Sequence, residues 1–293
     1  MLRDPTFGPD FLCVGMAKAG TGWLFDQLKH HPDFWMPPVK ELGYLKREQT
    51  WLKKGARRRL RALRTGAEKL SSWANRRPED VRDIAFLEAA SASMGNPSDI
   101  AGYANLFRYK EAALSGDITP GYANLDPVVI RQLAIMLPAL KLILLVRDPV
   151  DRAWSRLSMW ARQENFDTQL LEDPKAFRDF LETAGKLTSE SFPTQVVKRW
   201  KSNAPNLELR HFLFDDLVAD PKGFKRDILV YLGADSSKDD EWEADRNRKA
   251  GAAKLHMTTS LRSIMAEFFR DELLACAALF DGAARSWPAR YGI

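Results

Sequence analysis

Two short segments of the sequence carry residue types that bind phosphate or sulfate groups. The first runs from Gly15 to Trp23 and contains Gly15, Lys18, Gly20, Thr21 and Gly22. Glycine lets backbone N–H groups point into a loop, and the N-terminus of a following helix adds unpaired donors with a partial positive charge. The segment is therefore predicted to cradle an anion, with Lys18 supplying a full charge and Thr21 a hydroxyl.

The first segment matches only part of the nucleotide-binding P-loop, G-x-x-x-x-G-K-[ST]. Gly15 and Gly20 have the required spacing, but the next two residues are Thr21 and Gly22 instead of a lysine and a hydroxyl residue. A nucleotide kinase, the first alternative, also needs an aspartate after a strand to hold a metal ion. Asp148 is the only candidate for that aspartate.

The second segment, Arg147 to Ser155, follows the clearest buried-strand pattern of the chain, KLILLV at 141–146. Ligands of open α/β sheets bind at the carboxyl ends of parallel strands, so Arg147 should face the same crevice as the first segment. The planar guanidinium group makes two charge-assisted hydrogen bonds to a phosphate. We expect Arg147 and Ser155 to share one anion, and Arg152 to form an internal ion pair.

The periodicity of apolar residues indicates the elements that position both segments. Strands are predicted at 11–16, 141–146 and 207–217, and 115–125 has the composition of turns. Helices are predicted after Gly20 up to Pro32, at 79–95, 127–137, 174–186, 193–202 and 221–232, from Val150 onward and in one long C-terminal segment around Leu261. Strands that alternate with helices predict an α/β fold with a central parallel sheet flanked by helices. No repeat or linker divides the chain, so we expect a single domain over residues 1–293.

The composition excludes several classes of protein. The chain is 45% hydrophobic and 28% charged, as in ordinary globular proteins. It has no apolar run of about 20 residues that would span a bilayer, and its N-terminus lacks the pattern of a signal peptide. Cys13 and Cys276 suggest no disulfide framework, so a reduced cytoplasm is expected. No cluster of His, Cys and Asp has the spacing of metal ligands, and no metal is expected.

The net charge of +5 is unevenly distributed. Residues 46–78 contain twelve Lys or Arg against Glu48 and Glu68, so this segment carries +10 and the rest of the chain −5. It could be a solvated basic helix, or a surface that steers an anionic acceptor or a nucleic acid. A non-enzymatic nucleic-acid-binding protein is therefore the second alternative, although no stacking-aromatic motif accompanies the basic run and no nucleic-acid partner is expected.

The order K-x-G-T in the first segment and R-x-P-x-x-R-x-x-S in the second resembles the two donor-binding motifs of the sulfotransferases that use 3′-phosphoadenosine 5′-phosphosulfate (PAPS). The resemblance implies a P-loop-like fold and transfer of a sulfuryl group to a hydroxyl or amine, with release of adenosine 3′,5′-bisphosphate. It implies that the 3′-phosphate is bound by Arg147 and Ser155, and the phosphosulfate by Lys18, Ala19, Gly20, Thr21, Gly22 and Trp23. Where the family usually has a second hydroxyl residue this chain has Gly22, so one contact is missing or is made by the backbone.

Further segments resemble the same family, closest to its carbohydrate-type and bacterial branch. HHPDFWMPPVKELGYL contains the Lys-Glu pair of the family as Lys40 and Glu41. Sulfuryl transfer, like phosphoryl transfer, needs a base for the acceptor proton and a cation for the leaving group. The resemblance implies that Glu41 is the base, with Lys18 and Lys40 as cations. The competitors for the role of base are His30, His31, His211 and His256.

The remaining resemblance concerns a turn and a basic loop. GDITPGY resembles a turn between the two motifs, but Ile118 stands where many carbohydrate-type relatives have a lysine. Arg248 and Lys249 are expected to approach the 3′-phosphate. About three-quarters of the chain follows the family in order, with 46–78 interpreted as a basic helical insertion. The acceptor, whether a sugar, a lipid alcohol, a phenol or another small molecule, stays open, as does the oligomeric state.

Overall fold

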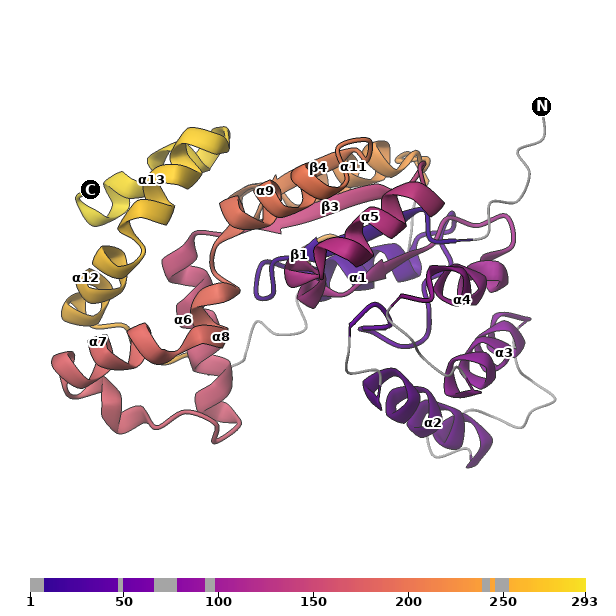
Figure 1. The fold of residues 1–293 in the computed structure, drawn as a ribbon, viewed down its shortest axis with the longest axis horizontal. Coiled ribbons are helices and arrows are strands. Elements are labelled where there is room, and N and C mark those ends of the chain that lie inside the picture. The colour runs from indigo at the N-terminus through magenta and orange to yellow at the C-terminus, as the bar shows by residue number, and fades with distance from the viewer. Residues whose placement is uncertain (1–7, 47–49, 66–77, 93–97, 239–242, 246–252) are drawn as a thin grey trace.

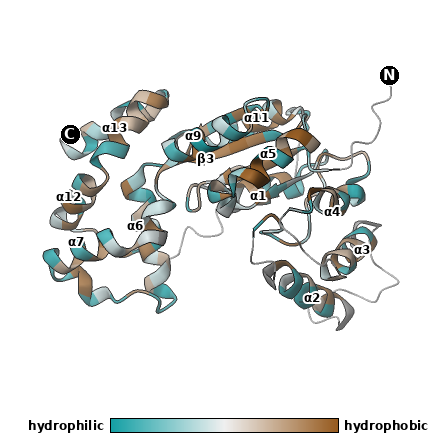
Figure 2. Ribbon diagram, viewed as in Figure 1, coloured by the Kyte–Doolittle hydropathy of each residue, from teal (hydrophilic) through white to brown (hydrophobic). Residues whose placement is uncertain are grey.

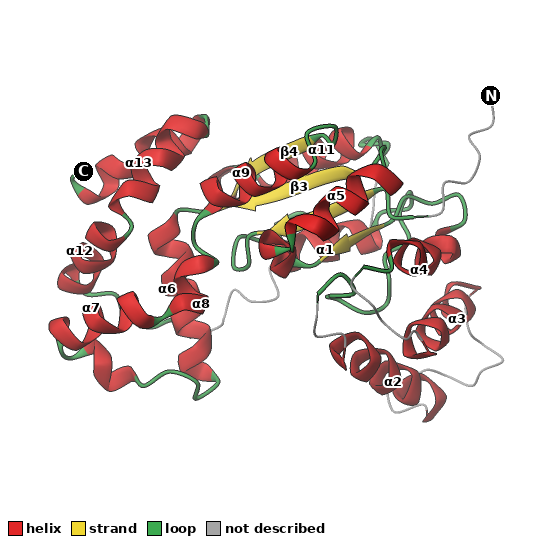
Figure 3. Ribbon diagram, viewed as in Figure 1, coloured by secondary structure: helices red, strands yellow, loops and turns green. Residues whose placement is uncertain are grey.

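The computed structural model describes residues 8–46, 50–65, 78–92, 98–238, 243–245 and 253–293. Within these ranges, four parallel strands form one sheet in the order β2–β1–β3–β4 (Figure 3). Their bounds are β1 Phe11–Gly15, β2 Gly116–Ile118, β3 Lys141–Val146 and β4 Leu209–Leu213. The predicted α/β fold with a central parallel sheet is confirmed.

The two central strands are buried along nearly their whole length, which explains their almost continuous apolar sequence. The predicted strand at 141–146 has the same bounds in the structure. β1 pairs with β3 through Cys13 opposite Ile143 and, after a shift in register, Gly15 opposite Leu144. The carboxyl ends of β1 and β3 therefore lie side by side.

Helices pack on the sheet, and further helices lie beyond it at both ends of the molecule (Figure 1). Their bounds are α1 Thr21–His30, α2 Thr50–Thr65, α3 Pro78–Ala92, α4 Ile100–Asn105, α5 Pro127–Met136, α6 Pro149–Arg162, α7 Pro174–Thr183, α8 Gly185–Ser189, α9 Pro193–Asn203, α10 Phe214–Ala219, α11 Pro221–Leu232, α12 Thr259–Phe268 and α13 Arg270–Leu279. Short 3₁₀ helices are formed by Leu106–Lys110, Pro120–Asn124, Thr168–Leu171, Gly282–Ser286 and Pro288–Tyr291. Figure 1 shows α2 and α3 at one end of the long axis, and α7, α12 and α13 at the other.

Four predicted boundaries were wrong. The turn predicted at 115–125 contains the edge strand β2, and the strand predicted at 207–217 ends at Leu213 because α10 follows it. The helix predicted at 174–186 breaks at Ala184, and the long C-terminal helix breaks at Phe269. The side chain of Phe269 is fully buried, so this break places an aromatic anchor in the core.

The basic segment forms an amphipathic helix over the part that the structure describes. The apolar face of α2 is buried through Leu52, Ala56, Leu60 and Leu63. The exposed cations occur at the spacing of one helix face, at Lys54, Arg57, Arg58 and Arg61. The ribbon of α2 in Figure 2 carries the colour of hydrophilic residues along much of its length. Residues 66–77 of the predicted insertion lie outside the described residues.

Both cysteines are free thiols buried in the core, Cys13 in β1 and Cys276 in α13. Burial raises the pKa of the Cys13 thiol to about 12 and that of Cys276 as well, so neither is a reactive thiolate at neutral pH. The predicted compartment stays a prediction. In the part of the chain that the structure describes, no helix has the length and apolar character required to cross a membrane.

Candidate functional site

The topology of the sheet places the two segments that were predicted to bind anions at one edge. From β1 the chain moves to β2 on one side and then crosses to β3 on the other side of β1. The loops that follow β1 and β3 therefore diverge from neighbouring strand ends, which is the point where open α/β sheets bind ligands. The first loop leads into α1, and the second leads directly into α6.

The first loop has the backbone geometry of an anion cradle. Lys18 and Gly20 adopt left-handed conformations, with φ of 74° and 98°. Gly20 caps α1 without a side-chain hydrogen bond, and the first turn of the helix has no acidic residue. A Cβ atom at Gly20 would be in tight contact with Leu217 Cδ2 of α10, at 3.0 Å, and the positive φ of this position would strain any other residue. The N-terminus of α1 thus presents backbone donors and a positive dipole end to an anion.

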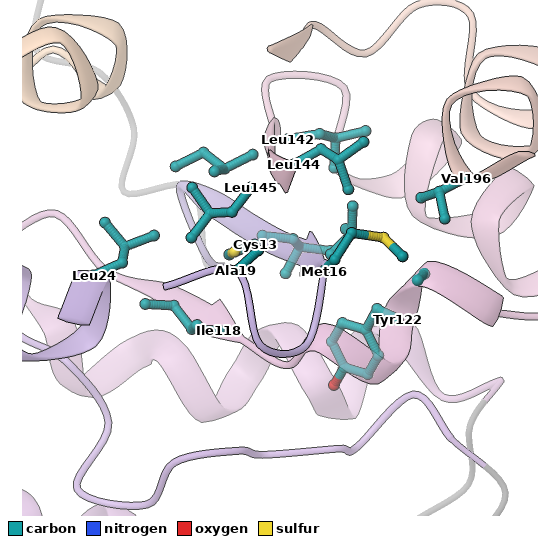
Figure 4. Packing of buried hydrophobic residues seen from close by; sticks show 14 of the residues in the cluster. Cys13, Met16, Ala19, Leu24, Ile118, Tyr122, Leu142, Leu144, Leu145 and Val196 are labelled. Carbon is teal, nitrogen blue, oxygen red and sulfur yellow. The ribbon is translucent and has the colours of Figure 1, made fainter. Parts of the chain in front are cut away.

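The buried side of this loop belongs to the hydrophobic core. Figure 4 shows Met16 and Ala19 among the side chains of Leu144 and Leu145 from β3. The amide of Met16 also donates to the carbonyl of Leu145 at 2.7 Å. The loop is therefore held on its apolar side, which fixes the direction of its outward-facing groups.

Arginines of the second segment hold the first loop directly. Arg147 Nη1 donates to the carbonyl oxygen of Lys18 at 3.1 Å, and Arg152 Nε donates to that of Ala17 at 3.0 Å. The guanidinium carbon of Arg147 lies 4.5 Å from the centroid of the Phe214 ring. These contacts bring the two predicted motifs together and support the unusual conformation of Lys18.

The charge of Arg147 is only partly compensated. Burial lowers the pKa of its guanidinium group, while Asp151, Asp148 and Asp215 raise it. Among the described residues its buried Nε has no hydrogen-bond partner. A half-buried cation whose buried Nε is an unused donor, at the end of a parallel strand, is suited to bind a phosphate.

Arg152 forms the internal ion pair that was expected from the sequence. Its side chain is 1% exposed and binds Glu190 Oε2 at 2.7 Å, Ser191 Oγ at 2.7 Å and the Leu187 carbonyl at 2.9 Å. Burial lowers its pKa to about 10, which still leaves it charged at neutral pH. Arg152 thus links the first loop to α8.

We predict that Arg152→Met destabilises the protein by about 3 kcal/mol, because removing one partner of a buried ion pair leaves polar groups unsatisfied. Urea unfolding followed by circular dichroism measures this loss. The matched control is Arg285→Met, because the Arg285–Asp281 pair is exposed on the surface and should contribute little. Equal unfolding midpoints for the two variants would contradict the prediction.

The Lys-Glu segment reaches the first loop from the other side. Lys40 Nζ lies 3.5 Å from Thr21 Oγ1, and the side chains of Lys40 and Glu41 are both half-buried. Their charges also act on the buried thiol of Cys13 in β1, in opposite directions. Lys18 thus lies within the first loop, Lys40 lies beside it, and Glu41 follows Lys40 in the sequence.

Some of the predicted site residues have other contacts or lie outside the described ranges. The indole N–H of Trp23 donates to the Ala244 carbonyl at 2.6 Å. An anion in the loop would therefore be bound by the backbone of Trp23 and not by its indole group. Ser155 is half-buried on α6, in the turn after Arg152. Arg248 and Lys249 lie outside the described residues.

The described residues before and after positions 246–252 are nevertheless anchored at the two motifs. Ala244 contacts α1 through Trp23, as above. Beyond the loop, the Leu255 carbonyl accepts from Trp154 Nε1 at 2.9 Å, and the Leu255 amide donates to Ser158 Oγ at 3.2 Å. The described residues that flank positions 246–252 therefore contact the helix of the first segment on one side and the helix of the second segment on the other.

Three of the four histidines make structural contacts. His30 Nδ1 lies 2.7 Å from the Asp26 carbonyl, and buried His31 contacts the Asp235 carbonyl at 3.2 Å at the end of α1. His211 packs against Phe280, and burial lowers the pKa of its ring. His256 is exposed.

One buried acid near the site, Asp117 at the centre of β2, was not predicted from the sequence. Its carboxylate is 1% exposed and accepts hydrogen bonds from the hydroxyls of Thr119, Tyr122 and Tyr103. Burial raises its pKa to about 6, against the lowering effect of the three donors. The neighbouring Ile118 is buried and contributes no polar group to the acceptor side (Figure 4).

Comparisons with known proteins identify the family and the fold of the chain. The model of the Sulfotransferase family matches residues 9–239. The solved structure of a sulfotransferase from Alicyclobacillus acidocaldarius superposes with a TM-score of 0.63 at 21% identity, covering 95% of this chain and 98% of that one. The sulfotransferase domain of the Synechococcus PCC 7002 olefin synthase gives a TM-score of 0.48 at 17% identity, covering 91% and 97%. No curated protein sequence matches significantly. The first structure shows that the fold is shared.

Proposed function

Because the chain belongs to the sulfotransferase family, we propose that it moves a sulfuryl group from PAPS to a hydroxyl or amine of an acceptor. The observation that carries the choice of donor is the direct contact between the two anion-binding motifs, from Arg147 to the Lys18 carbonyl. PAPS carries two anionic groups on one nucleotide, the 5′-phosphosulfate and the 3′-phosphate. Two cationic motifs at adjacent strand ends fit such a donor.

In this proposal each charged residue has one role. Glu41 takes the proton of the acceptor as the acceptor oxygen or nitrogen forms its bond to sulfur. The bond from sulfur to the bridging oxygen breaks, and that oxygen leaves with the electron pair as part of adenosine 3′,5′-bisphosphate. Lys18 stabilises the negative charge that develops there, and Lys40 adds a second cation beside Thr21.

The alternative of a nucleotide kinase is less well supported. Asp148, the aspartate that would have to hold a metal ion, accepts from the amide of Val150 at 2.9 Å as the N-cap of α6. Its other oxygen accepts from the hydroxyl of Tyr291, also at 2.9 Å. The carboxylate is thus used in capping a helix and in fixing the C-terminal residues.

We predict that Arg147→Ala weakens the binding of adenosine 3′,5′-bisphosphate by about 10- to 100-fold, the usual effect of losing charged hydrogen bonds. Isothermal titration calorimetry measures the affinity. Arg131→Ala, an exposed arginine on α5, is the matched control and should bind like the wild type. Unchanged affinity in Arg147→Ala, with an unchanged melting temperature, would remove Arg147 from the donor site.

The activity itself is tested by transfer from radiolabelled PAPS to a panel of sugars, lipid alcohols, phenols and amines. We expect labelled product with at least one acceptor class, together with an equal amount of adenosine 3′,5′-bisphosphate. If ATP with Mg²⁺ phosphorylated members of the panel while PAPS transferred nothing, the kinase alternative would replace this proposal.

A further inference from the structure

The buried carboxylate of Asp117 orients two hydroxyl groups. Thr119 Oγ1 donates to Asp117 Oδ1 at 2.6 Å, and the Tyr122 hydroxyl donates to Oδ2 at 2.7 Å. Tyr103 adds a third donor at 3.1 Å. A hydroxyl has a single proton, so once it donates to a carboxylate its oxygen can only accept from other groups.

Both oriented hydroxyls accept from one backbone segment. The amide of Gly43 donates to Thr119 Oγ1 at 3.2 Å, and the amide of Leu45 donates to the Tyr122 hydroxyl at 3.4 Å. Two relays therefore run in parallel, each from a backbone amide through a hydroxyl to one oxygen of Asp117.

The anchored amides lie directly after the Lys-Glu pair. They belong to a turn in which Gly43 has a φ of 62° and its carbonyl accepts from the amide of Lys46 at 3.1 Å. Before the pair, Lys40 contacts Thr21 of the phosphate-binding loop. The segment with Glu41 is thus held at the loop by Lys40 and at β2 by the relays.

Such an anchor matters because Glu41 has no regular secondary structure to fix it. Ordering a loop residue costs conformational entropy, and a small displacement of a catalytic group lowers the rate by about 100-fold. An apolar side chain at position 117 would avoid the cost of burying a carboxylate. The contribution of Asp117 therefore comes from the direction that it imposes on Thr119 and Tyr122.

We propose that Asp117 is a positioning residue that acts through Thr119 and Tyr122 to hold the Lys40–Glu41 segment against the phosphate-binding loop. The inference rests on the proposed function, because it assigns Glu41 as the base. The hydrogen bonds themselves are testable without any activity.

The matched variants are Thr119→Val, which removes the hydroxyl but keeps the shape, and Thr119→Ser, which keeps the hydroxyl. Hydrogen–deuterium exchange of peptides covering residues 41–46 reports on the two anchored amides. We expect Thr119→Val to accelerate exchange at Gly43 by about tenfold, the effect of one lost hydrogen bond, and Thr119→Ser to resemble the wild type. Tyr122→Phe should do the same at Leu45.

The kinetic measurement separates positioning from general stability. In Thr119→Val and Tyr122→Phe we expect kcat for sulfuryl transfer to fall by about 10- to 100-fold, while affinity for adenosine 3′,5′-bisphosphate stays within about twofold of wild type. Thr119→Ser should restore kcat. These variants avoid Asp117→Asn, whose amide donors would face the hydroxyls and could prevent folding.

Three results have distinct meanings. Exchange in Thr119→Val equal to that of the wild type would overturn the relay. Faster exchange with unchanged kcat would overturn the positioning role. If the wild type neither bound adenosine 3′,5′-bisphosphate nor transferred a sulfuryl group, the proposed function would fail, and with it the role in positioning a base, whereas the exchange data would still decide whether the relay exists.

Discussion

Lys18→Ala should reduce kcat for sulfuryl transfer by about a thousandfold or more, because electrostatic stabilisation of a developing charge is usually the largest single contribution to catalysis. Lys18 is the lysine within the phosphate-binding loop, and its carbonyl is fixed by Arg147. The backbone at Lys18 is therefore fixed before the reaction begins, so only its side chain has to be oriented towards the leaving group. Initial rates with saturating PAPS measure the effect.

Two further variants test whether the loss of activity comes from the charge of Lys18. Lys18→Met keeps the aliphatic stem without the charge and should be as inactive as Lys18→Ala. Lys29→Ala, in the last turn of the same helix that the loop precedes, removes an exposed lysine and should be as active as the wild type. A kcat within about tenfold of wild type in both Lys18 variants would remove the lysine from the chemistry.

Glu41→Gln should lower kcat by about 10²- to 10⁴-fold with the affinity for adenosine 3′,5′-bisphosphate retained, the range expected when a general base is lost. Glutamine preserves the size and the hydrogen-bonding capacity of the side chain but cannot accept the acceptor proton at neutral pH. Transfer kinetics give kcat, and calorimetry gives the affinity. Glu182→Gln, an exposed carboxylate on α7, is the matched control.

An unchanged rate in Glu41→Gln would return the role of base to a histidine. His31 would then be tested first, since it is buried at the end of α1 and its ring is already held by backbone groups. A loss of nucleotide affinity in Glu41→Gln would instead show that the carboxylate organises the donor site.

The central elements could be predicted because their signals are local. The continuous apolar run KLILLV at 141–146 predicts a strand, and β3 has the same bounds. The glycines that follow the apolar residues of β1 indicate a loop before the next helix. Both anion-binding motifs are short segments at the ends of these strands. The position of the two segments at these strand ends follows from the predicted strands, while their anion-binding role stays a prediction.

The contact between the motifs could not be predicted in the same way. The hydrogen bond from Arg147 to Lys18 depends on β1 and β3 being neighbours, which is a property of the strand order. The error at 207–217 has a related origin. Phe214 continues the apolar pattern of β4, but the chain turns into α10 so that Phe214 stacks on Arg147 and Leu217 covers Gly20.

Asp117 was missed because its sequence context suggests a turn. β2 is three residues long, too short for an alternating pattern to be recognised. The role of the carboxylate depends on contacts that form only in the folded protein. Tyr103 donates to the carboxylate, and the amides of Gly43 and Leu45 donate to the hydroxyls that it orients. Such a network joins segments far apart in sequence and leaves no local pattern.

The most direct test of the donor assignment is a calorimetric titration of the wild-type protein with adenosine 3′,5′-bisphosphate and, separately, with ATP and Mg²⁺. The account predicts saturable binding of adenosine 3′,5′-bisphosphate that is weakened in Arg147→Ala, and no comparable binding of ATP with Mg²⁺. Tight binding of ATP with Mg²⁺ and none of adenosine 3′,5′-bisphosphate would contradict it.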